Sequence, residues 1–237
     1  MAHRGNNVLF PENTLESFQQ SIKDGADIIE TDIHTTRDGK IVCIHDKTVD
    51  RTTDGHGAVR DMTVQEIKTL NASHYHPTYH VPTKVPLLQE LLEIVPDDVA
   101  IALEIKTDDL LTAEALQELL NVLTATNTIN RTLILSFHEN QLTTIQAFIP
   151  QLPIGLISLF KIFPSSKVDV SGLFYPSLLL MPLFPLFTHR KGQLFCPLDP
   201  TPDRRLWLYK LLKCDAILSN NTMATRILMQ KYWKRAY

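Results

Sequence analysis

The sequence predicts an α/β fold, and a closed (β/α)8 barrel is the architecture that fits it best. Short, almost wholly apolar runs alternate with amphipathic helical patterns along the chain, which is typical of a parallel sheet covered by helices. The length of 237 residues is close to the ~250 that such barrels occupy. A doubly wound open sheet is the alternative, but no G-x-G-x-x-G follows the first strand and only 8 residues are glycine.

The N-terminal half contains the clearest element patterns. The first strand is short, because only Met1 and Ala2 precede His3 whereas strands usually have about 5 residues. Residues 14–24 place their apolar side chains on one helical face, which ends at Gly25. The further elements expected in this half are strands at 27–33, 40–45 and 99–105 and helices at 63–70, 86–94 and 112–124.

The C-terminal half continues the alternation. Residues 172–187 carry no charged side chain, but a membrane-spanning helix needs about 20 residues and three prolines interrupt this run. We therefore expect a buried strand, a turn and one helix there, with contact to a lipid or a lipid-like substrate as the alternative. The other expected elements are strands at 132–137, 153–159, 193–198 and 215–219 and helices at 141–148, at 203–212 and from 222.

Charge and cysteine content limit the classes of function. The net charge of −3 argues against nucleic-acid binding, which needs a strong basic excess. The 3 cysteines are too few and too scattered for a disulfide framework, and the N-terminus lacks the apolar core of a signal peptide. These features predict a cytoplasmic protein.

Acidic side chains recur near the ends of two predicted strands. Glu30 and Asp32 are two residues apart and share one face of a strand, and Glu104 and Lys106 repeat that spacing. Because barrel active sites lie at the carboxyl ends of the strands, we expect these residues to converge there. Carboxylate oxygens are the ligands that Mg²⁺ and Ca²⁺ prefer.

Two imidazoles and two cationic side chains are expected at the same end of the barrel. His3 and Arg4 end the first strand, and His45 follows the third. The histidines lack the spacing of zinc motifs, so we interpret them as an acid/base pair. Arg4 and Lys106 beside a metal ion suit an anion with several oxygens, such as phosphate. The combination indicates metal-assisted phosphoryl chemistry.

The chain resembles the glycerophosphodiester phosphodiesterase family, of the bacterial cytoplasmic type, over nearly its whole length. The N-terminal motifs are long and occur in the family's order, which makes the resemblance specific. The motifs are H-R-G at 3–5, P-E-N-T at 11–14, G-A-D-I-I-E-T-D-I at 25–33, T-R-D-G at 36–39, H-D at 45–46, R-T-T-D-G at 51–55 and L-E-I-K at 103–106.

This resemblance implies one catalytic (β/α)8 barrel domain over residues 1–237, with a small insertion after the second strand at about 46–82. It implies hydrolysis of glycerophosphodiesters to sn-glycerol 3-phosphate and an alcohol. The matching positions are Glu30, Asp32 and Glu104 for a divalent metal ion, Mg²⁺ or Ca²⁺, His3 and His45 for the general acid and base, and Arg4 and Lys106 for the substrate phosphate.

Two segments depart from the family pattern. C-P-L-D at 196–199 stands where the family has an aromatic-led segment, which leaves the shape of the headgroup pocket open. Ser219 and Asn220 replace a T-D pair at the end of the eighth strand. The short first strand further predicts that His3 is weakly held.

Two other groups of polar residues have weaker functional readings. Glu12 and Asn13 lie in the P-E-N-T turn, and we interpret them as mainly structural, with Glu12 as an outer partner of the metal site. His74, His76 and His80 in the insertion either form a second metal site or belong to a polar loop beside the substrate entrance.

Two other functions compete with the leading one. The apolar run favours a lysophospholipase D that acts on acylated lysophospholipids, so the expected partner is a small glycerophosphodiester or a lysophospholipid, with peripheral membrane contact through 172–187. A catalytically silent binding protein on the same fold is the other alternative. The intact set of acidic and histidine side chains speaks against it.

Overall fold

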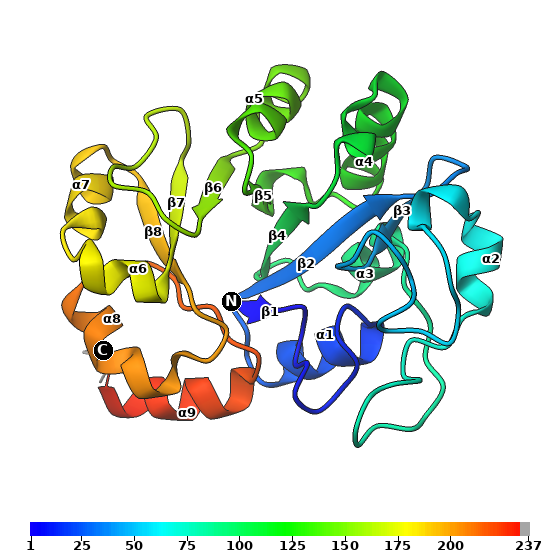
Figure 1. The fold of residues 1–237 in the computed structure, drawn as a ribbon, viewed down its shortest axis with the longest axis horizontal. Helices are drawn as coiled ribbons and strands as arrows, with labels where there is room; N and C mark the ends of the chain where they lie inside the picture. Colours follow the sequence, from blue (N-terminus) through cyan, green and yellow to red (C-terminus); the bar gives the residue numbers. More distant parts are fainter. Residues whose placement is uncertain (233–237) are drawn as a thin grey trace.

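The computed structural model describes residues 1–232 and contains one curled parallel sheet surrounded by helices (Figure 1). The strands pair side by side in chain order, with β3 off the main path. The strands on this path are β1 (Ala2–His3), β2 (Ile28–Thr35), β4 (Ala100–Ile105), β5 (Thr132–Ser136), β6 (Ile154–Ser158), β7 (Val170–Phe174) and β8 (Leu194–Leu198).

Residues 215–219 close the sheet into a barrel. Asp215 N donates to Phe195 O at 2.9 Å on the β8 side. On the β1 side, Ser219 N donates to Met1 O at 3.0 Å and His3 N donates to Ser219 O at 2.9 Å. This segment was predicted as the eighth strand, and it forms a single parallel bridge from Ala2 to Ser219 because β1 offers only two residues to pair with. The (β/α)8 barrel and its short first strand are confirmed.

β3 (Ile41–Cys43) lies antiparallel to the end of β2 and leads into an inserted segment. This segment includes the 3₁₀ turn η1 (Val59–Asp61) and helix α2 (Val64–Thr69). Val49, Val59 and Ile67 form a small apolar cluster under it with Val42 of β3. The insertion therefore has its own packing beside the carboxyl end of β2.

The helices cover the outside of the sheet. Helix α1 starts at a capping box in which Thr14 and Ser17 each accept a hydrogen bond from the backbone N–H of the other. Phe18 and Leu91 pack with Ile29 and Ile101 in the main core, between helices and sheet. Outside the insertion and the run at 172–187, the helices and 3₁₀ turns are α1 (Leu15–Lys23), α3 (Leu88–Ile94), η2 (Asp108–Leu111), α4 (Ala113–Ala125), η3 (Ile129–Arg131), α5 (Glu139–Phe148), η4 (Pro202–Arg205), α8 (Leu206–Leu211) and α9 (Thr222–Tyr232).

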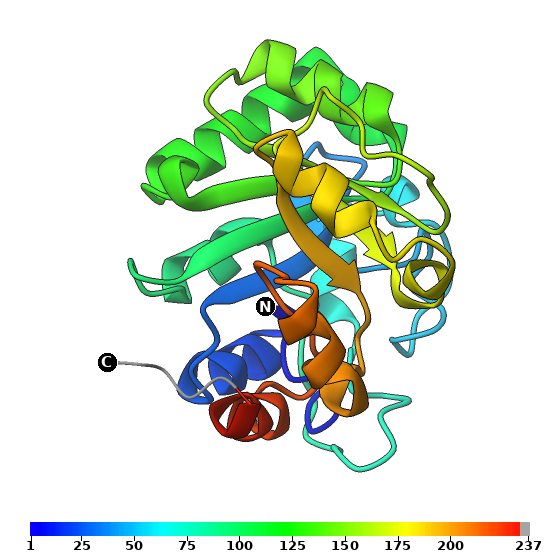
Figure 2. The same ribbon diagram turned by 90° about the vertical axis from the view of Figure 1, so that its left-hand side faces the viewer.

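The two ends of the described chain meet on one side of the barrel. Figure 2 shows α9 beside α1. Thr222 Oγ1 lies 3.4 Å from Ser21 Oγ, and the Arg226 guanidinium donates to Gly25 O. These contacts hold the closing segment, and with it β1, in place.

The apolar run at 172–187 differs from the prediction. It contains the end of β7 and two short helices instead of one, α6 (Tyr175–Leu180) and α7 (Phe184–Arg190). Pro182 lies between the two helices, where its missing N–H and fixed φ interrupt helical hydrogen bonding. Leu178 and Phe184 are buried, so only part of the run is core. No helix within residues 1–232 is long and apolar enough to cross a bilayer.

Candidate active site

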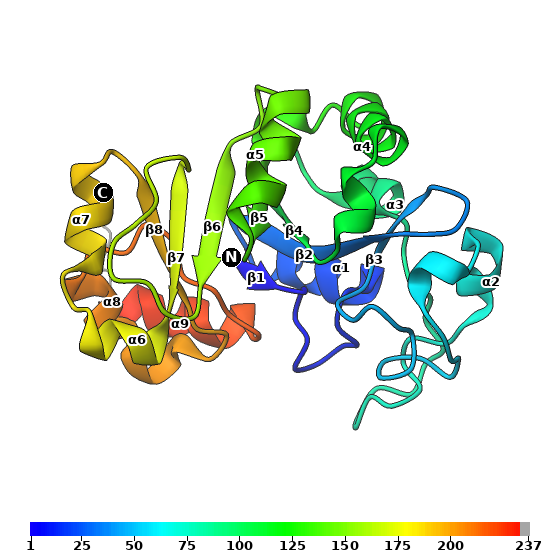
Figure 3. The ribbon, with the colours of Figure 1, turned by 45° about the horizontal axis from the view of Figure 1, so that its top comes forward.

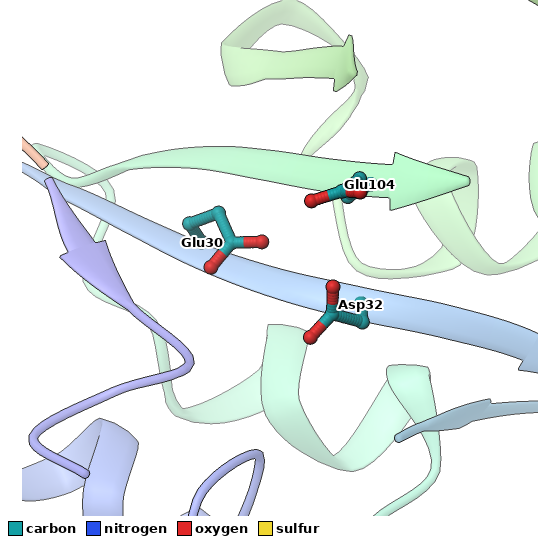
Figure 4. Close-up of side chains that lie close together, drawn as sticks. All are labelled: Glu30, Asp32 and Glu104. Atoms are coloured by element: carbon teal, nitrogen blue, oxygen red, sulfur yellow. The ribbon is translucent and has the colours of Figure 1, made fainter. Parts of the chain in front are cut away.

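Three buried carboxylates, two from β2 and one from near the carboxyl end of β4, face a common point (Figure 4). Glu30 and Asp32 lie on the same face of β2, and the parallel register places Asp32 directly beside Glu104 of β4. One carboxylate oxygen from each residue lies within 4.8 Å of the others. The convergence expected from the i, i+2 spacing is thus present.

Arg4 and Lys106 lie against this cluster. The Arg4 Nε lies 3.1 Å from Asp32 Oδ2, and the Arg4 backbone N–H donates to Glu30 Oε2 at 2.8 Å. The Lys106 Nζ lies 3.0 Å from Asp32 Oδ1 and also pairs with Glu104. Both cations are therefore at the position that the sequence assigned to them.

The carboxylates do not share one electrostatic environment. Burial and the negative charge of Asp32 raise the pKa of Glu30 well above its usual value, and the same two causes raise the pKa of Glu104. Burial also raises the pKa of Asp32, but the positive charges of Arg4 and Lys106 outweigh this effect and hold the pKa below its usual value. Three carboxylates against two cations leave excess negative charge, which either a proton or a bound metal ion would neutralise.

The donor set fits a hard divalent cation. Glu30 Oε1 is buried without a hydrogen-bond partner, which is costly unless a cation or a proton meets it. Oxygens on one Mg²⁺ or Ca²⁺ lie about 2.0–2.6 Å from the ion, so separations below about 5 Å are compatible with a shared ion. Glu30, Asp32 and Glu104 could thus hold a metal ion. Within residues 1–232 no second acidic, histidine or cysteine group has comparable geometry, so the metal-site reading of His74, His76 and His80 has no support.

His3 is held more firmly than its short strand predicts. Its Nδ1 lies 2.6 Å from Asn220 Oδ1, and that oxygen also accepts from Asn7 Nδ2 at 3.0 Å. Because Asn220 Oδ1 only accepts, the proton of the neutral imidazole is on Nδ1 and Nε2 carries the free lone pair. Burial and the charge of Arg4 lower the pKa of His3 to about 4. The expectation of a weakly held His3 is wrong, because Asn220 and Asn7 compensate for the missing strand.

His45 has a different partner. Its Nδ1 lies 2.6 Å from Asp46 Oδ1, and Ile44 N donates to Asp32 O at 3.0 Å, which fixes the chain next to the carboxylates. A hydrogen bond from Arg51 lowers the pKa of Asp46 to about 2, so the group beside His45 is an anion. The Asp46 carboxylate thus holds the His45 ring through Nδ1.

A chain of ion pairs links the His45 side of the site to Arg4. Arg51 contacts both Asp46, at 2.6 Å, and Glu12, at 2.7 Å, and Glu12 contacts Arg4 at 3.0 Å. Glu12 therefore holds the guanidinium of Arg4, and its role as an outer partner of a metal site stays a prediction. The sequence motifs included Asp46 and Arg51, but nothing in their spacing predicted this chain.

The turn that carries Arg4 and Asn13 has an unusual backbone. Arg4 has φ of 57°, Gly5 of 79° and Asn13 of 54°, all in the left-handed region. A Cβ on Gly5 would lie 2.7 Å from the backbone carbon of Ser17, so only glycine fits. Asn13 Nδ2 donates to Asp32 Oδ2 at 2.9 Å. Asn13 thus contacts the acidic cluster and is more than the structural turn residue that the sequence indicated.

Below the carboxylates the barrel interior contains an apolar cavity of about 160 Å³. Leu133, Leu135 and Ile157 contribute to its wall, and Glu30 and Glu104 border it. The low polarity of this wall helps to explain the raised pKa values of the two glutamates.

Comparison with known proteins gives the family. A model of the glycerophosphoryl diester phosphodiesterase family matches residues 3–165. The chain belongs to this family. The resemblance carried by the sequence motifs is therefore confirmed, and the six motifs from 3–5 to 51–55, together with L-E-I-K, all lie within the matched part.

Two bacterial relatives carry the name glycerophosphodiester phosphodiesterase. The chain is 38% identical over 158 residues to a glycerophosphodiester phosphodiesterase of Caldanaerobacter subterraneus subsp. tengcongensis, a match that covers 66% of this chain and 65% of that protein. It is 31% identical over 160 residues to one of Bacillus altitudinis, covering 67% and 65%. The matches thus span slightly less than two thirds of each relative.

Solved structures of the family share the fold. A glycerophosphodiester phosphodiesterase of Agrobacterium tumefaciens superposes with a TM-score of 0.75 at 23% identity, covering 94% of this chain and 97% of the other. A phosphodiesterase of Oleispira antarctica, solved with the product sn-glycerol 3-phosphate, has a TM-score of 0.82 at 21% identity, covering 97% and 95%. At these identities the likeness shows the barrel fold.

Proposed function

We propose that this protein, as one catalytic domain over residues 1–237, hydrolyses glycerophosphodiesters to sn-glycerol 3-phosphate and an alcohol. The observation that carries the proposal is the buried cluster of Glu30, Asp32 and Glu104 in a chain of this family. His3 pairs in register with Glu30, and His45 follows Ile44, whose N–H donates to Asp32 O. The activity named for the bacterial relatives and the product named for the Oleispira structure support it. The three unpaired cysteines agree with a reducing compartment, for which we propose the cytoplasm.

The acidic cluster would hold Mg²⁺ or Ca²⁺. When bound, the cation supplies positive charge that stabilises the phosphoryl oxygens as negative charge develops on them. Glu30 Oε1 lacks another partner and is the oxygen most available for it. The raised pKa of Glu30 means that binding displaces a proton from the cluster at pH values below that pKa.

Arg4 and Lys106 would bind the substrate phosphate. The guanidinium of Arg4 carries five N–H donors and the ammonium of Lys106 three, so each retains donors beyond its contacts with Asp32. Both are partly accessible, with side chains 17% and 14% exposed, whereas Asp32 is at 0%. They therefore present positive charge at the surface of the cluster, where a phosphodiester anion would approach.

The hydrogen bonds of the two histidines suggest different roles. Neutral His3, with its Nδ1 proton on Asn220, presents a lone pair on Nε2 and suits the general base that takes the proton of the attacking oxygen. That oxygen belongs either to water or to the glycerol hydroxyl next to the phosphate. His45, paired with anionic Asp46, suits the general acid that protonates the leaving alkoxide.

The proposal is tested by release of sn-glycerol 3-phosphate from a panel of glycerophosphodiesters, with chelator and after addition of Mg²⁺ or Ca²⁺. We expect activity that chelator abolishes and a divalent ion restores. Glu104→Gln should lower kcat by roughly 10²-fold or more, whereas Glu114→Gln, an exposed glutamate on α4, should have no effect. Full activity in excess chelator would exclude the metal assignment, and no release from any substrate would favour the silent binding protein.

A lysophospholipase D is the second candidate. Several leucine and phenylalanine side chains near the active-site end are exposed, which favours a substrate that keeps an acyl chain. Comparing glycerophosphocholine with lysophosphatidylcholine distinguishes the two activities. Turnover of the acylated substrate alone would replace the leading proposal by this one.

A further inference from the structure

Exposed apolar side chains gather around the connections that follow β6 and β7. We define the apolar rim as Leu159, Phe160, Phe163, Leu179, Leu180 and Leu183, whose exposures range from 56% to 73%. A soluble domain exposes single leucines routinely, but six large apolar side chains within 25 residues of sequence are a patch that needs a partner.

The rim is one continuous surface. Ser177 Oγ of α6 donates to Leu159 O, which ties the first helix to the β6–β7 connection. The rings of Phe163 and Phe187 have centroids 5.4 Å apart, which ties the same connection to α7. Figure 3 shows this connection passing beside α6 at the end of the barrel to which β6 and β7 point. The two segments are therefore in contact with each other.

The rim adjoins the active site. Leu159 and Phe160 line a common depression with Phe137, which follows β5. The Lys106 Nζ lies 5.9 Å from the centre of the Phe137 ring. Because Lys106 also contacts Asp32, only two side chains separate the acidic cluster from the rim.

The charge around the rim is positive although the whole chain has a net charge of −3. Residues 159–167, the part of the β6–β7 connection that carries the rim, contain two lysines, Lys161 and Lys167, and no acidic residue. Glu139 of α5 lies 3.7 Å from Lys161 and 3.5 Å from Lys167, so it offsets part of this excess. Large apolar side chains interspersed with cations are the composition that partitions into an anionic bilayer surface.

We propose that the apolar rim docks on an anionic phospholipid bilayer. The inference rests on the proposed function in its second form, the lysophospholipase D, because a substrate that keeps an acyl chain resides in such a bilayer. In the docked orientation Leu180 and Phe160 enter the headgroup region, Lys161 and Lys167 meet lipid phosphates, and the active-site end of the barrel faces the membrane. The rim thus extends the contact expected at 172–187 to the β6–β7 connection.

The test is co-sedimentation of the full chain with vesicles of phosphatidylcholine alone or with about one third phosphatidylglycerol. We expect binding to the anionic vesicles that weakens with salt. Phe160→Ser/Leu180→Ser should bind at least roughly tenfold more weakly, since burial of one such side chain is worth about that factor. Leu194→Ser is the matched control, because Leu194 is 55% exposed at the start of β8, the opposite end of the strands, and should bind like wild type.

Hydrolysis of water-soluble glycerophosphocholine separates the rim from the active site. The serine variants should keep wild-type turnover of that substrate, because none of the substituted residues contacts the acidic cluster or the histidines.

If the protein binds vesicles as predicted but turns over no substrate, the proposal that the rim docks on a bilayer is supported and the proposed function is refuted. If Phe160→Ser/Leu180→Ser binds vesicles as well as wild type does, or if wild type does not bind, the docking proposal is overturned. Self-association by sedimentation velocity that the same variant abolishes, without vesicle binding, would assign the surface to a second copy of the chain and also overturn it.

Discussion

Asp32 and Glu104 lie side by side in register on the neighbouring parallel strands β2 and β4, and both are buried. Two buried carboxylates at adjacent strand positions repel each other, so the fold keeps them only with compensating charge. Arg4 and Lys106 supply part of it, and Glu30 adds a third carboxylate that they do not fully balance. The excess negative charge is the physical basis of the proposed metal site.

Glu30→Gln should stabilise the metal-free protein and remove its response to metal. Because the folded-state pKa of Glu30 is raised, its protonated form contributes stability that is present at acid pH and lost as the pH rises through that pKa. At pH 7.5 in chelator the variant should therefore melt at least about 2–4 °C higher, the shift that 1 kcal/mol produces in a chain of this size.

The same melting experiment with saturating Mg²⁺ or Ca²⁺ completes this test. Wild type should gain roughly 5–10 °C at a metal concentration of about 100 times Kd, and the glutamine variant far less. At about pH 3, Glu30 is protonated in both the folded and the unfolded state, so the two proteins should melt alike in chelator. A variant that loses stability in chelator at pH 7.5 would contradict the assigned charge of Glu30.

His45→Ala should lower kcat for glycerophosphodiester hydrolysis by roughly 10²–10⁴-fold, because the leaving alkoxide loses its proton donor. His56→Ala is the control, since His56 is an exposed residue of the insertion paired with Asp50. It should keep wild-type kcat. Wild-type turnover in His45→Ala would remove His45 from the proposed mechanism.

Asn220→Asp should move the acid limb of the pH–rate profile to higher pH. His3 acts as a base only when neutral, so with a pKa of about 4 the wild-type kcat/KM should fall only as the pH drops toward that value. A carboxylate on Nδ1 stabilises the imidazolium and raises the pKa of His3, so the variant should lose activity at higher pH. Asn220→Ala, which removes the hydrogen bond without adding charge, should lower kcat without this upward shift. Identical acid limbs in wild type and Asn220→Asp would exclude His3 as the base.

Gly5→Ala should destabilise the protein and impair phosphate binding. The alanine meets both a left-handed backbone conformation and the backbone of Ser17, and the strain alone costs about 1–3 kcal/mol. The displaced turn carries Arg4, so KM should rise with it. Gly39→Ala separates the two effects, since Gly39 has φ of 74° but no atom within 4 Å of the added carbon. Chemical denaturation should show a clearly larger loss for Gly5→Ala than for Gly39→Ala.

The sequence was enough to predict those site residues whose positions follow from strand geometry. Alternation along a strand fixes that Glu30 and Asp32 share a face, and parallel pairing brings strand ends together, so the acidic cluster with Glu104 was predictable. The same reasoning located Arg4 and Lys106. The barrel itself followed from the repeated β and α patterns.

Contacts between loops could not be predicted from the sequence patterns. Asn220 contacts His3 across 217 positions of sequence. From the sequence, Asn220 is only a departure from the family pattern, and nothing indicates that it is a hydrogen-bond partner of His3. The link from Arg51 to Glu12 depends on how the insertion folds back over the site. The sequence predicts one helix where the structure has α6 and α7, because the effect of a proline on a short apolar run depends on which neighbours cover it.

The most direct test of the central claim is anomalous X-ray diffraction from a crystal grown with Mn²⁺ or Ca²⁺. We expect one strong peak at about 2.0–2.6 Å from an oxygen of each of Glu30, Asp32 and Glu104. Absence of a peak between these carboxylates at saturating metal, or a peak held by other residues alone, would contradict a metal site built by the three.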